Sequence, residues 1–179
     1  MVLAETLPYG LRDVKVTPLT GETLGTPVDL PNGRTFSFEE NEDFEELRGD
    51  DKVVAQRGQG ATVSWELESG GISLEAYAVM NGGLVTSSGT TPAQVKTYSK
   101  KSTDSKPRFQ VEGQSISESG GDFHCLLYNC KATESLSGEM SDGAFWLTSA
   151  SGTAIGRASD DKVYDFVQNE TAVAIDITP

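Results

Sequence analysis

The fold of this chain is decided by residues 36 to 83, which read FSFEENEDFEELRGDDKVVAQRGQGATVSWELESGGISLEAYAVMNGG. From residue 61 to residue 68 apolar and polar side chains alternate, and the apolar positions are Ala61, Val63, Trp65 and Leu67. A period of two is that of a β-strand, because successive side chains point to opposite faces of a sheet. This segment therefore predicts a strand with one buried and one solvent-facing side.

The period of the pattern changes after the Gly70-Gly71 turn. The residues expected on one helix face recur three or four positions apart and are Leu74, Tyr77, Ala78 and Asn81. Ser73 suits an N-cap, and Gly82-Gly83 suits a C-terminal stop. The pattern predicts a short helix over about residues 73 to 81, with an apolar face that lies on a sheet.

The residues before the alternating strand predict the first arm of a long hairpin over about residues 34 to 67. Eight of the thirteen residues from Glu39 to Asp51 are acidic, and Arg48 is the only basic residue among them. Gly58 and Gly60 predict a bend or bulge in the returning arm. Both a solvated acidic loop and a surface used in assembly are compatible with such a charge run.

Shorter alternating stretches, separated by turn signals, predict further strands. They are Leu11 to Leu19, Pro27 to Leu30, Leu84 to Ser87, Ala93 to Lys100, Phe109 to Ile116, Asp122 to Thr133, Ala144 to Ile155 and Thr171 to Ile177, with Asp161 to Gln168 open between a helical turn and a strand. Roughly nine strands with one helix between two of them predict a mainly β fold. We expect a β-sandwich or a partly open barrel with one flanking α-helix.

The length of 179 residues and the even composition predict a single domain spanning residues 1–179. The formal net charge of −13 opposes a role in gripping nucleic acid, because phosphate binding needs a basic face. It does not oppose a role in letting nucleic acid pass without sticking. The apolar runs are too short to cross a bilayer, and residues 1 to 5 lack the features of a signal peptide. We therefore expect no membrane partner and a cytosol-like compartment.

The basic residues of the chain are clustered as well. Five of the fourteen lie within thirteen positions, and they are Lys96, Lys100, Lys101, Lys106 and Arg108. A self-associating subunit can use one acidic and one basic segment to bind a neighbour through complementary charge. The alternative is that both segments simply face water.

The sequence contains no arrangement typical of catalysis, metal binding or cofactor binding. The single histidine, His124, precedes Cys125 in a predicted strand, where adjacent side chains point to opposite faces and cannot share a proton. Cys125 and Cys130 are separated by five positions of the same strand, which predicts opposite faces and two reduced structural thiols. We expect no enzymatic activity, no metal and no cofactor.

Five short segments, taken together in their order and spacing, carry a resemblance to a known family. They are Leu47-Arg48-Gly49-Asp50-Asp51, residues 64 to 76 (SWELESGGISLEA), residues 88 to 92 (SGTTP), residues 111 to 114 (VEGQ) and residues 168 to 172 (QNETA). In combination they resemble the major tail tube proteins of long-tailed bacteriophages, particularly those infecting actinobacteria. The resemblance extends from about Leu11 to Ile175, and no single segment in it is a chemical signature.

The resemblance implies a structural subunit with a tail tube-like fold that closes into hexameric rings. Such rings stack into the conduit through which DNA is ejected from the capsid. The implied partners are copies of the chain itself, other tail proteins such as the tape measure and the tail terminator, and viral DNA that passes without specific binding. The implied location is the virion tail, after assembly in the cytoplasm of the bacterial host.

The long hairpin is the element that we expect to join one ring to the next, because it reaches beyond the body of the subunit. Its carboxylates are expected to meet the basic segment of a neighbour or to line the bore. A ring also joins the edge strands that a soluble monomer leaves open. The residues predicted in these contacts are Phe44, Glu45, Glu46, Leu47, Arg48, Asp50, Asp51, Lys100, Lys101, Lys106 and Arg108.

Two other functions are compatible with the sequence. One is that of the tube protein of type VI secretion systems, which is related in fold and also forms hexameric rings. The other is that of a monomeric β-sandwich binding module for carbohydrate or protein. Such modules usually present exposed aromatic residues, whereas Trp65 shares a core-like face with Val63 and Leu67, and Trp146 is the candidate for exposure.

Overall fold

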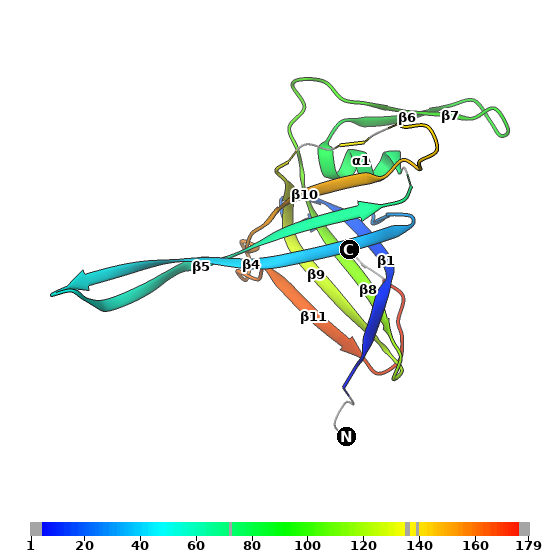
Figure 1. Cartoon of the computed structure of the whole chain (residues 1–179). Helices are drawn as coiled ribbons and strands as arrows, with labels where there is room; N and C mark the ends of the chain where they lie inside the picture. The colour runs from blue at the N-terminus through cyan, green and yellow to red at the C-terminus, as the bar shows by residue number, and fades with distance from the viewer. Residues whose placement is uncertain (1–4, 72, 135–136, 139, 176–179) are drawn as a thin grey trace.

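The computed structural model describes residues 5–71, 73–134, 137–138 and 140–175 (Figure 1). In chain order its elements are β1 (Pro8–Thr20), β2 (Thr23–Leu24), β3 (Val28–Asp29), β4 (Gly33–Gly49), β5 (Lys52–Ser69), α1 (Leu74–Asn81), β6 (Leu84–Ser88), β7 (Val95–Ser99), β8 (Arg108–Ser117), β9 (Asp122–Ala132), β10 (Thr148–Ala154) and β11 (Tyr164–Asn169). The prediction of a mainly β chain with one short helix is confirmed.

Nine of the strands belong to one antiparallel sheet. Its strand order is β2-β1-β8-β9-β10-β5-β4, with β3 also paired to β1 and β11 also paired to β9. Strands β6 and β7 form a separate hairpin. The hydrogen bonds therefore connect the main body into a single sheet, and the two separate sheets expected of a sandwich are not formed by the described strands.

This sheet curls so that its two ends face each other across one apolar core. Trp65 of β5 meets Phe109 of β8 edge to face, with ring centroids 5.6 Å apart. Phe36 of β4 lies against β8 at Gly113, where an added Cβ would come within 2.5 Å of the Phe36 ring. No ladder joins β4 to β1 among the strands that the structure describes. Of the two predicted architectures, the partly open barrel is the closer.

One edge of strand β9 pairs with β8, and the other edge pairs with two different strands. Residues 122 to 127 pair with β11, whereas residues 130 to 132 pair with β10. Between them, opposite Gln110 of β8, the register shifts, and Asn129 adopts a left-handed φ of 48°. This bulge reverses the alternation of side chains, so Cys125 and Cys130 both lie in the core. The prediction that the two cysteines face opposite ways is wrong for this reason.

The helix begins and ends as the sequence predicts. Ser73 is the N-cap, its Oγ accepting the Ala76 N–H at 3.2 Å, and Gly82 with φ 77° closes the C-terminus. The buried face, however, is displaced around the axis from the predicted one and consists of Ala76, Tyr77, Val79 and Met80. Within the described ranges, no helix is both long and apolar enough to span a membrane.

Two predicted strands are shorter than expected or absent. The predicted arm Ala144 to Ile155 is a strand only over Thr148–Ala154. Residues 171 to 175 form no strand, and the rest of that prediction, residues 176 and 177, lies outside the described residues. This segment is held by side chains instead, since Lys15 Nζ donates to the Ile175 carbonyl at 2.8 Å. The ambiguous segment from Asp161 to Gln168 is a strand over Tyr164–Asn169.

Candidate assembly surfaces

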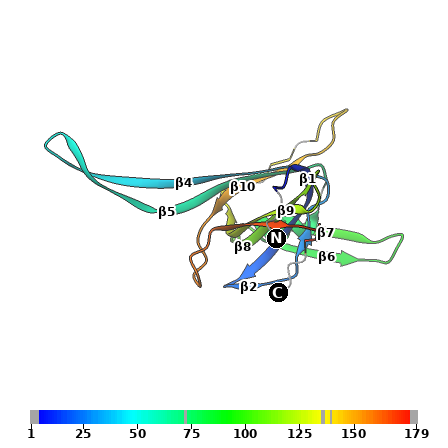
Figure 2. The ribbon, with the colours of Figure 1, turned by 90° about the horizontal axis from the view of Figure 1, so that it is seen from below.

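The β4–β5 hairpin leaves the body and extends far from it (Figures 1 and 2). Its arms pair up to Gly49 and Lys52, and a two-residue turn of Asp50 and Asp51 joins them. Both turn residues have positive φ, 49° and 62°. Two central residues with positive φ match the right-handed twist of the flanking strands. The predicted hairpin over about 34 to 67 is confirmed.

A bulge marks the point where the hairpin separates from the body. Glu42 pairs with Ala61 and Phe44 with Gly58, so the register shifts between the two pairs. Gly60 takes a φ of +99° there, which a residue with a side chain rarely adopts. The bend or bulge predicted at Gly58 and Gly60 is therefore present.

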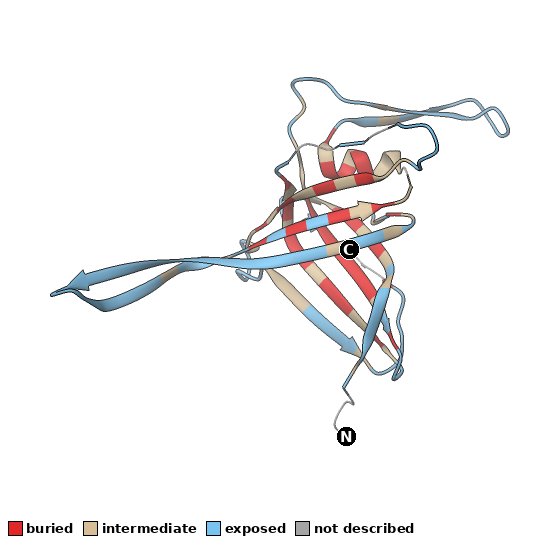
Figure 3. Cartoon of the chain, in the orientation of Figure 1, coloured by how far each residue is buried: buried red, intermediate tan, exposed pale blue. Residues whose placement is uncertain are grey.

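Every residue from Ser37 to Arg57 is exposed, including the apolar ones. Figure 3 shows the projecting part of the hairpin in the colour of exposed residues, apart from a short intermediate patch. The exposed large apolar side chains near its tip belong to Phe44, Leu47, Val53 and Val54. Such a group without a core function is typical of a binding surface. Phe44 and Leu47 are among the predicted contact residues, whereas Val53 and Val54 are not, although two consecutive valines beside the turn are a signal in the sequence.

The acidic charge of the hairpin is mostly unneutralised. Arg48 donates to Glu46 at 2.9 Å, and among the described residues no other carboxylate from Glu39 to Asp51 is in an ion pair. Glu45 is the cross-strand neighbour of Arg57. Asp50 and Asp51 carry their charges at the turn itself. The tip is thus a small apolar surface bordered by carboxylates.

Only Lys96 of the basic segment lies on β7; the other four basic residues follow it, in the connection to β8 and at the start of β8. Strands β6 and β7 project away from the body in the direction opposite to the β4–β5 hairpin in both views (Figures 1 and 2). Lys100 and Lys101 follow β7 and are exposed, whereas Lys106 and Arg108 are half-buried. Arg108 donates to the Asn129 carbonyl at 3.0 Å, and Lys106 donates to that of Glu134.

The structure therefore does not bring the two predicted charged groups together within one chain. Among the described residues, no ion pair joins the acidic hairpin to the basic segment. Any contact between them would have to form between different copies.

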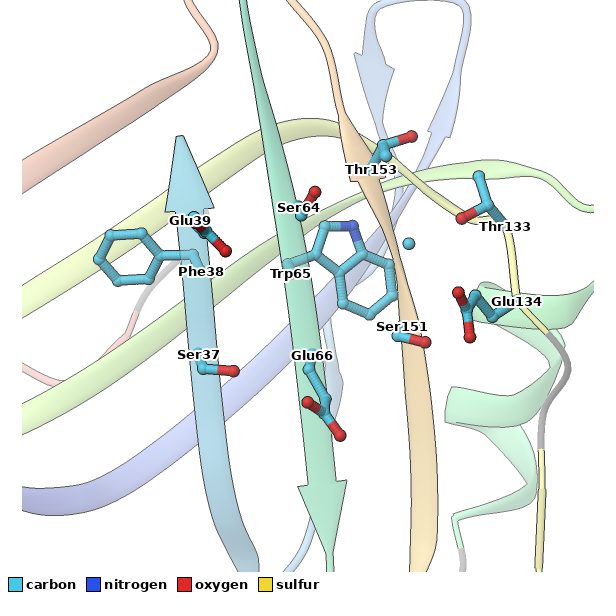
Figure 4. Close-up of a pocket in the computed structure, with 11 residues that line it drawn as sticks. Ser37, Phe38, Glu39, Ser64, Trp65, Glu66, Thr133, Glu134, Ser151 and Thr153 are labelled. Carbon is cyan, nitrogen blue, oxygen red and sulfur yellow. The ribbon is translucent and has the colours of Figure 1, made fainter. Parts of the chain in front are cut away.

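The outer face of β4, β5 and β10 forms a polar surface beside the base of the hairpin. A shallow hollow of about 510 Å³ lies on it, and Figure 4 shows that Ser, Thr and Glu side chains line it together with Phe38 and Trp65. The carboxylates come from Glu39, Glu66 and Glu134, and no lining residue is basic. This surface offers an anion no attractive charge.

A cluster of polar side chains is buried on β8 and β9. His124 Nδ1 lies 2.7 Å from Glu112 Oε1, and its Nε2 lies 2.9 Å from Asp122 Oδ2. The Asp122 carboxylate also accepts from the Gln114 amide at 2.6 Å and from the Val173 backbone N–H at 2.8 Å. All four of these side chains are buried. They hold the segment after β11 against the body.

The charges in this group are set by their hydrogen bonds. Burial by itself lowers the pKa of His124, but hydrogen bonds from the ring to Glu112 and Asp122 outweigh it and raise the pKa. For Asp122 burial acts in the opposite direction and raises the pKa. Hydrogen bonds donated by His124, Gln114, Asn169 and Val173 outweigh this effect and lower the pKa to about 2. These hydrogen bonds therefore favour the protonated form of the histidine.

The candidate nucleophile next to this histidine is held neutral. Burial, assisted by the charge of Glu112, raises the pKa of the Cys125 thiol to about 12. Cys125 and Cys130 are both buried free thiols, as predicted. Over the part of the chain that the structure describes, no group of three His, Cys, Asp or Glu side chains is arranged to hold a metal ion.

Comparison with known proteins adds no relative to this picture. No protein-family model matches the chain, and no curated protein sequence matches it.

Proposed function

We propose that this chain is a structural subunit of a bacteriophage tail tube, which closes into hexameric rings that stack into a conduit for DNA ejection. The observation that carries the proposal is the β4–β5 hairpin. It projects from the body, exposes Phe44, Leu47 and Val54, and carries a run of unneutralised carboxylates. A monomer gains nothing from such an element, whereas a stacked ring gains a contact with the next ring.

The unpaired strand edges of the sheet support the same proposal. Strand β4 lies at one end of the strand order, and among the described strands β11 pairs with β9 alone. Open edges favour pairing with another chain unless they are covered. Closure of a ring of identical subunits covers the edge of each one with its neighbour.

The polar face of β4, β5 and β10 is the surface that we assign to the bore. It carries Glu39 and Glu66 among Ser and Thr side chains, with no basic residue in the hollow at its centre. Phosphate is repelled by carboxylates and retained by lysine or arginine. Viral DNA would therefore slide along this face without being held.

A structural role also agrees with the chemistry of the buried groups. Both ring nitrogens of His124 are occupied by carboxylates, and the Cys125 thiol is neutral and buried. These groups stabilise the body and are closed to a substrate. In this proposal the remaining partners are the tail proteins at the two ends of the tube, and the site of action is the virion tail.

The test is the assembly state of the purified chain. Size-exclusion chromatography with light scattering, from micromolar to millimolar concentration, should show growth into large species as concentration rises. Negative-stain microscopy of these species should show rings with a central hole and stacks of them. A protein that stays monomeric over the whole range, in low and high salt, would contradict the proposal and favour a binding module.

A further inference from the structure

Exposed apolar side chains also occur on β6, on β7 and between β9 and β10. They belong to Leu84 of β6, Val95 of β7, and Met140 and Phe145 of the segment between β9 and β10. Met140 is 82 % exposed and Phe145 is 93 % exposed, which is extreme for side chains of this size. These residues form a second group of large exposed apolar side chains besides that of the hairpin tip.

A concave site lies within this second surface. A hollow of about 290 Å³ is lined by Leu74, Tyr77, Tyr98, Ser137, Gly138, Met140 and Trp146. Tyr77 of α1 and Tyr98 of β7 form one wall, with ring centroids 5.9 Å apart. Gly138 packs so closely on the Trp146 ring that an added Cβ would come within 2.4 Å of it. We call this site the α1–β7 hollow.

The α1–β7 hollow has a basic border. Lys96, Tyr98 and Lys100 alternate along one face of β7 and its continuation, so the two lysines flank the tyrosine of the hollow. Lys96 pairs with Glu75 of α1 at 2.6 Å, and Lys100 donates to the carbonyl of Asn81. The two lysines are therefore fixed beside the hollow.

The hairpin tip and the α1–β7 hollow match in both shape and charge. The tip is convex and apolar with an acidic border, whereas the hollow is concave and apolar with a basic border. A volume of about 290 Å³ is at the small end for a drug-sized ligand and suits one or two apolar side chains. Buried apolar anchors surrounded by complementary charges are the usual anatomy of a specific interface.

The two surfaces do not meet within one chain, because the β4–β5 hairpin extends away from α1 and β7 (Figures 1 and 2). We propose that the α1–β7 hollow of one subunit receives the apolar tip of the β4–β5 hairpin of a second copy, with Leu47 and Val54 as the anchors. This inference rests on the proposed function and specifies where the hairpin binds. The contact is head to tail, so it repeats from copy to copy and builds a stack without a fixed length.

The experiment places a charge in each half of the contact. Met140→Glu introduces a carboxylate at the hollow, and Leu47→Glu introduces one at the tip; both positions are exposed, so the body should fold normally. Each variant alone should raise the concentration needed for tube growth at least tenfold. Leu7→Glu, a substitution at an equally exposed leucine away from both surfaces, is the matched control and should leave growth unchanged.

Mixing the two variants tests whether the surfaces bind each other. The Met140→Glu subunit retains an intact tip, and the Leu47→Glu subunit retains an intact hollow, so one of the two possible contacts survives in the mixture. When rings of each variant are prepared separately and then mixed in equal amounts, they should form pairs of rings that grow no further, as measured by sedimentation velocity and by microscopy. This result would identify the two surfaces as partners.

The possible outcomes separate this inference from the proposed function. If the wild-type chain forms tubes and Met140→Glu forms them equally well, the hollow is not the receptor, although the tube proposal stands. If each variant fails alone but the mixture forms no pairs, the tip binds elsewhere. If the wild-type chain never assembles, both proposals fail together.

Discussion

His124 shows how one buried residue ties distant parts of the chain together. Its ring bridges Glu112 of β8 and Asp122 of β9, and the same Asp122 carboxylate accepts the backbone N–H of Val173. Gln114 donates to the Val173 carbonyl at 2.8 Å, which completes the contact with this segment. A buried charged group of this kind is stable only while each member keeps its partner.

The stability of the chain should therefore depend on pH through His124. Its raised pKa means that its stabilisation is complete below about pH 6.5, the ordinary value, and is lost as the pH rises through the raised value. Asp122 acts in the opposite sense, because its pKa is lowered from 3.8 to about 2. Its contribution is complete above about pH 4 and is lost as the pH falls toward 2. Denaturant unfolding should show the largest free energy between these limits.

The variant His124→Gln isolates the histidine contribution. It should lower the free energy of unfolding at pH 5 by about 3 kcal/mol, because two buried carboxylates lose their cation. The difference from wild type should shrink as the pH rises from 6.5 through the raised pKa of His124, where the ring of the folded wild-type protein loses its proton. An equal difference at pH 5 and at pH 9 would show that the ring is not charged in the folded protein.

At the level of single residues, the sequence predicts which side chains are buried better than which partners they have. The separation of Cys125 and Cys130 predicts opposite faces, but a bulge with Asn129 at φ 48° lies between them. Nothing in the local pattern signals that bulge, because Asn tolerates positive φ and also occurs in regular structure. The polar partners of His124 come from other strands and depend on register, which the sequence does not show.

The β4–β5 hairpin is the element whose removal should separate folding from assembly. Beyond the pair Glu42 and Ala61 it contributes no residue to the core. Replacing residues 43 to 60 with an Asn-Gly turn closes the remaining arms with a favoured two-residue loop. The shortened chain should keep its melting temperature within a few degrees and lose the ability to form stacks, as measured by circular dichroism and sedimentation.

A matched control keeps the length of the hairpin but changes only its turn. Asp50→Asn with Asp51→Gly suits two positive φ values better than the natural residues do and should preserve the arms. If the shortened chain loses much of its thermal stability while this control does not, the hairpin stabilises the body. Its role would then not be limited to contacts with other copies.

The elements that the sequence predicts well are those with a regular period and clear ends. The alternation from Ala61 to Glu68 and the capped helix after Ser73 both appear as expected. The predictions that are wrong concern segments whose apolar residues serve other surfaces. Phe145 and Trp146 look like part of a strand, yet they belong to the exposed segment at the α1–β7 hollow. Residues 171 to 175 alternate as well, but side chains from other strands hold them.

The sequence shows how many charged residues cluster along the chain, but it does not show where these clusters lie in space. The acidic run and the basic cluster can both be counted from the residues, and the hairpin explains why the acidic run is exposed. That the acidic hairpin and the β6–β7 hairpin, which carries Lys96, project in opposite directions is visible only in the three-dimensional structure (Figures 1 and 2). The α1–β7 hollow is also visible only in the structure, because its lining residues come from α1, β7 and the segment before β10. Hence the acidic residues of the hairpin tip are predicted from the sequence one by one. Of the apolar residues in the candidate contact, only Phe44 and Leu47 are predicted.

Reversing charge on the hairpin distinguishes specific attraction from general repulsion between copies. The change Glu45→Lys with Glu46→Lys moves the net charge from −13 to −9, since each substitution alters the charge by two. If like charge merely keeps copies apart, the less negative protein should assemble more readily. If the acidic border meets Lys96, Lys100 and Lys101 of a neighbour, the reversed protein should assemble less readily, although its net negative charge is smaller.

We expect the second result, with shorter tubes and slower growth for the reversed protein. The pair Glu45→Gln with Glu46→Gln should fall between wild type and the reversed protein. Because exposed charges are screened over about 10 Å at 0.1 M salt, the difference between the proteins should narrow as salt is added. Tube length measured by microscopy and growth followed by light scattering, at low and at high salt, provide the comparison. Faster growth of the reversed protein at low salt would exclude attraction between the acidic hairpin and these lysines and leave repulsion as the effect of the hairpin.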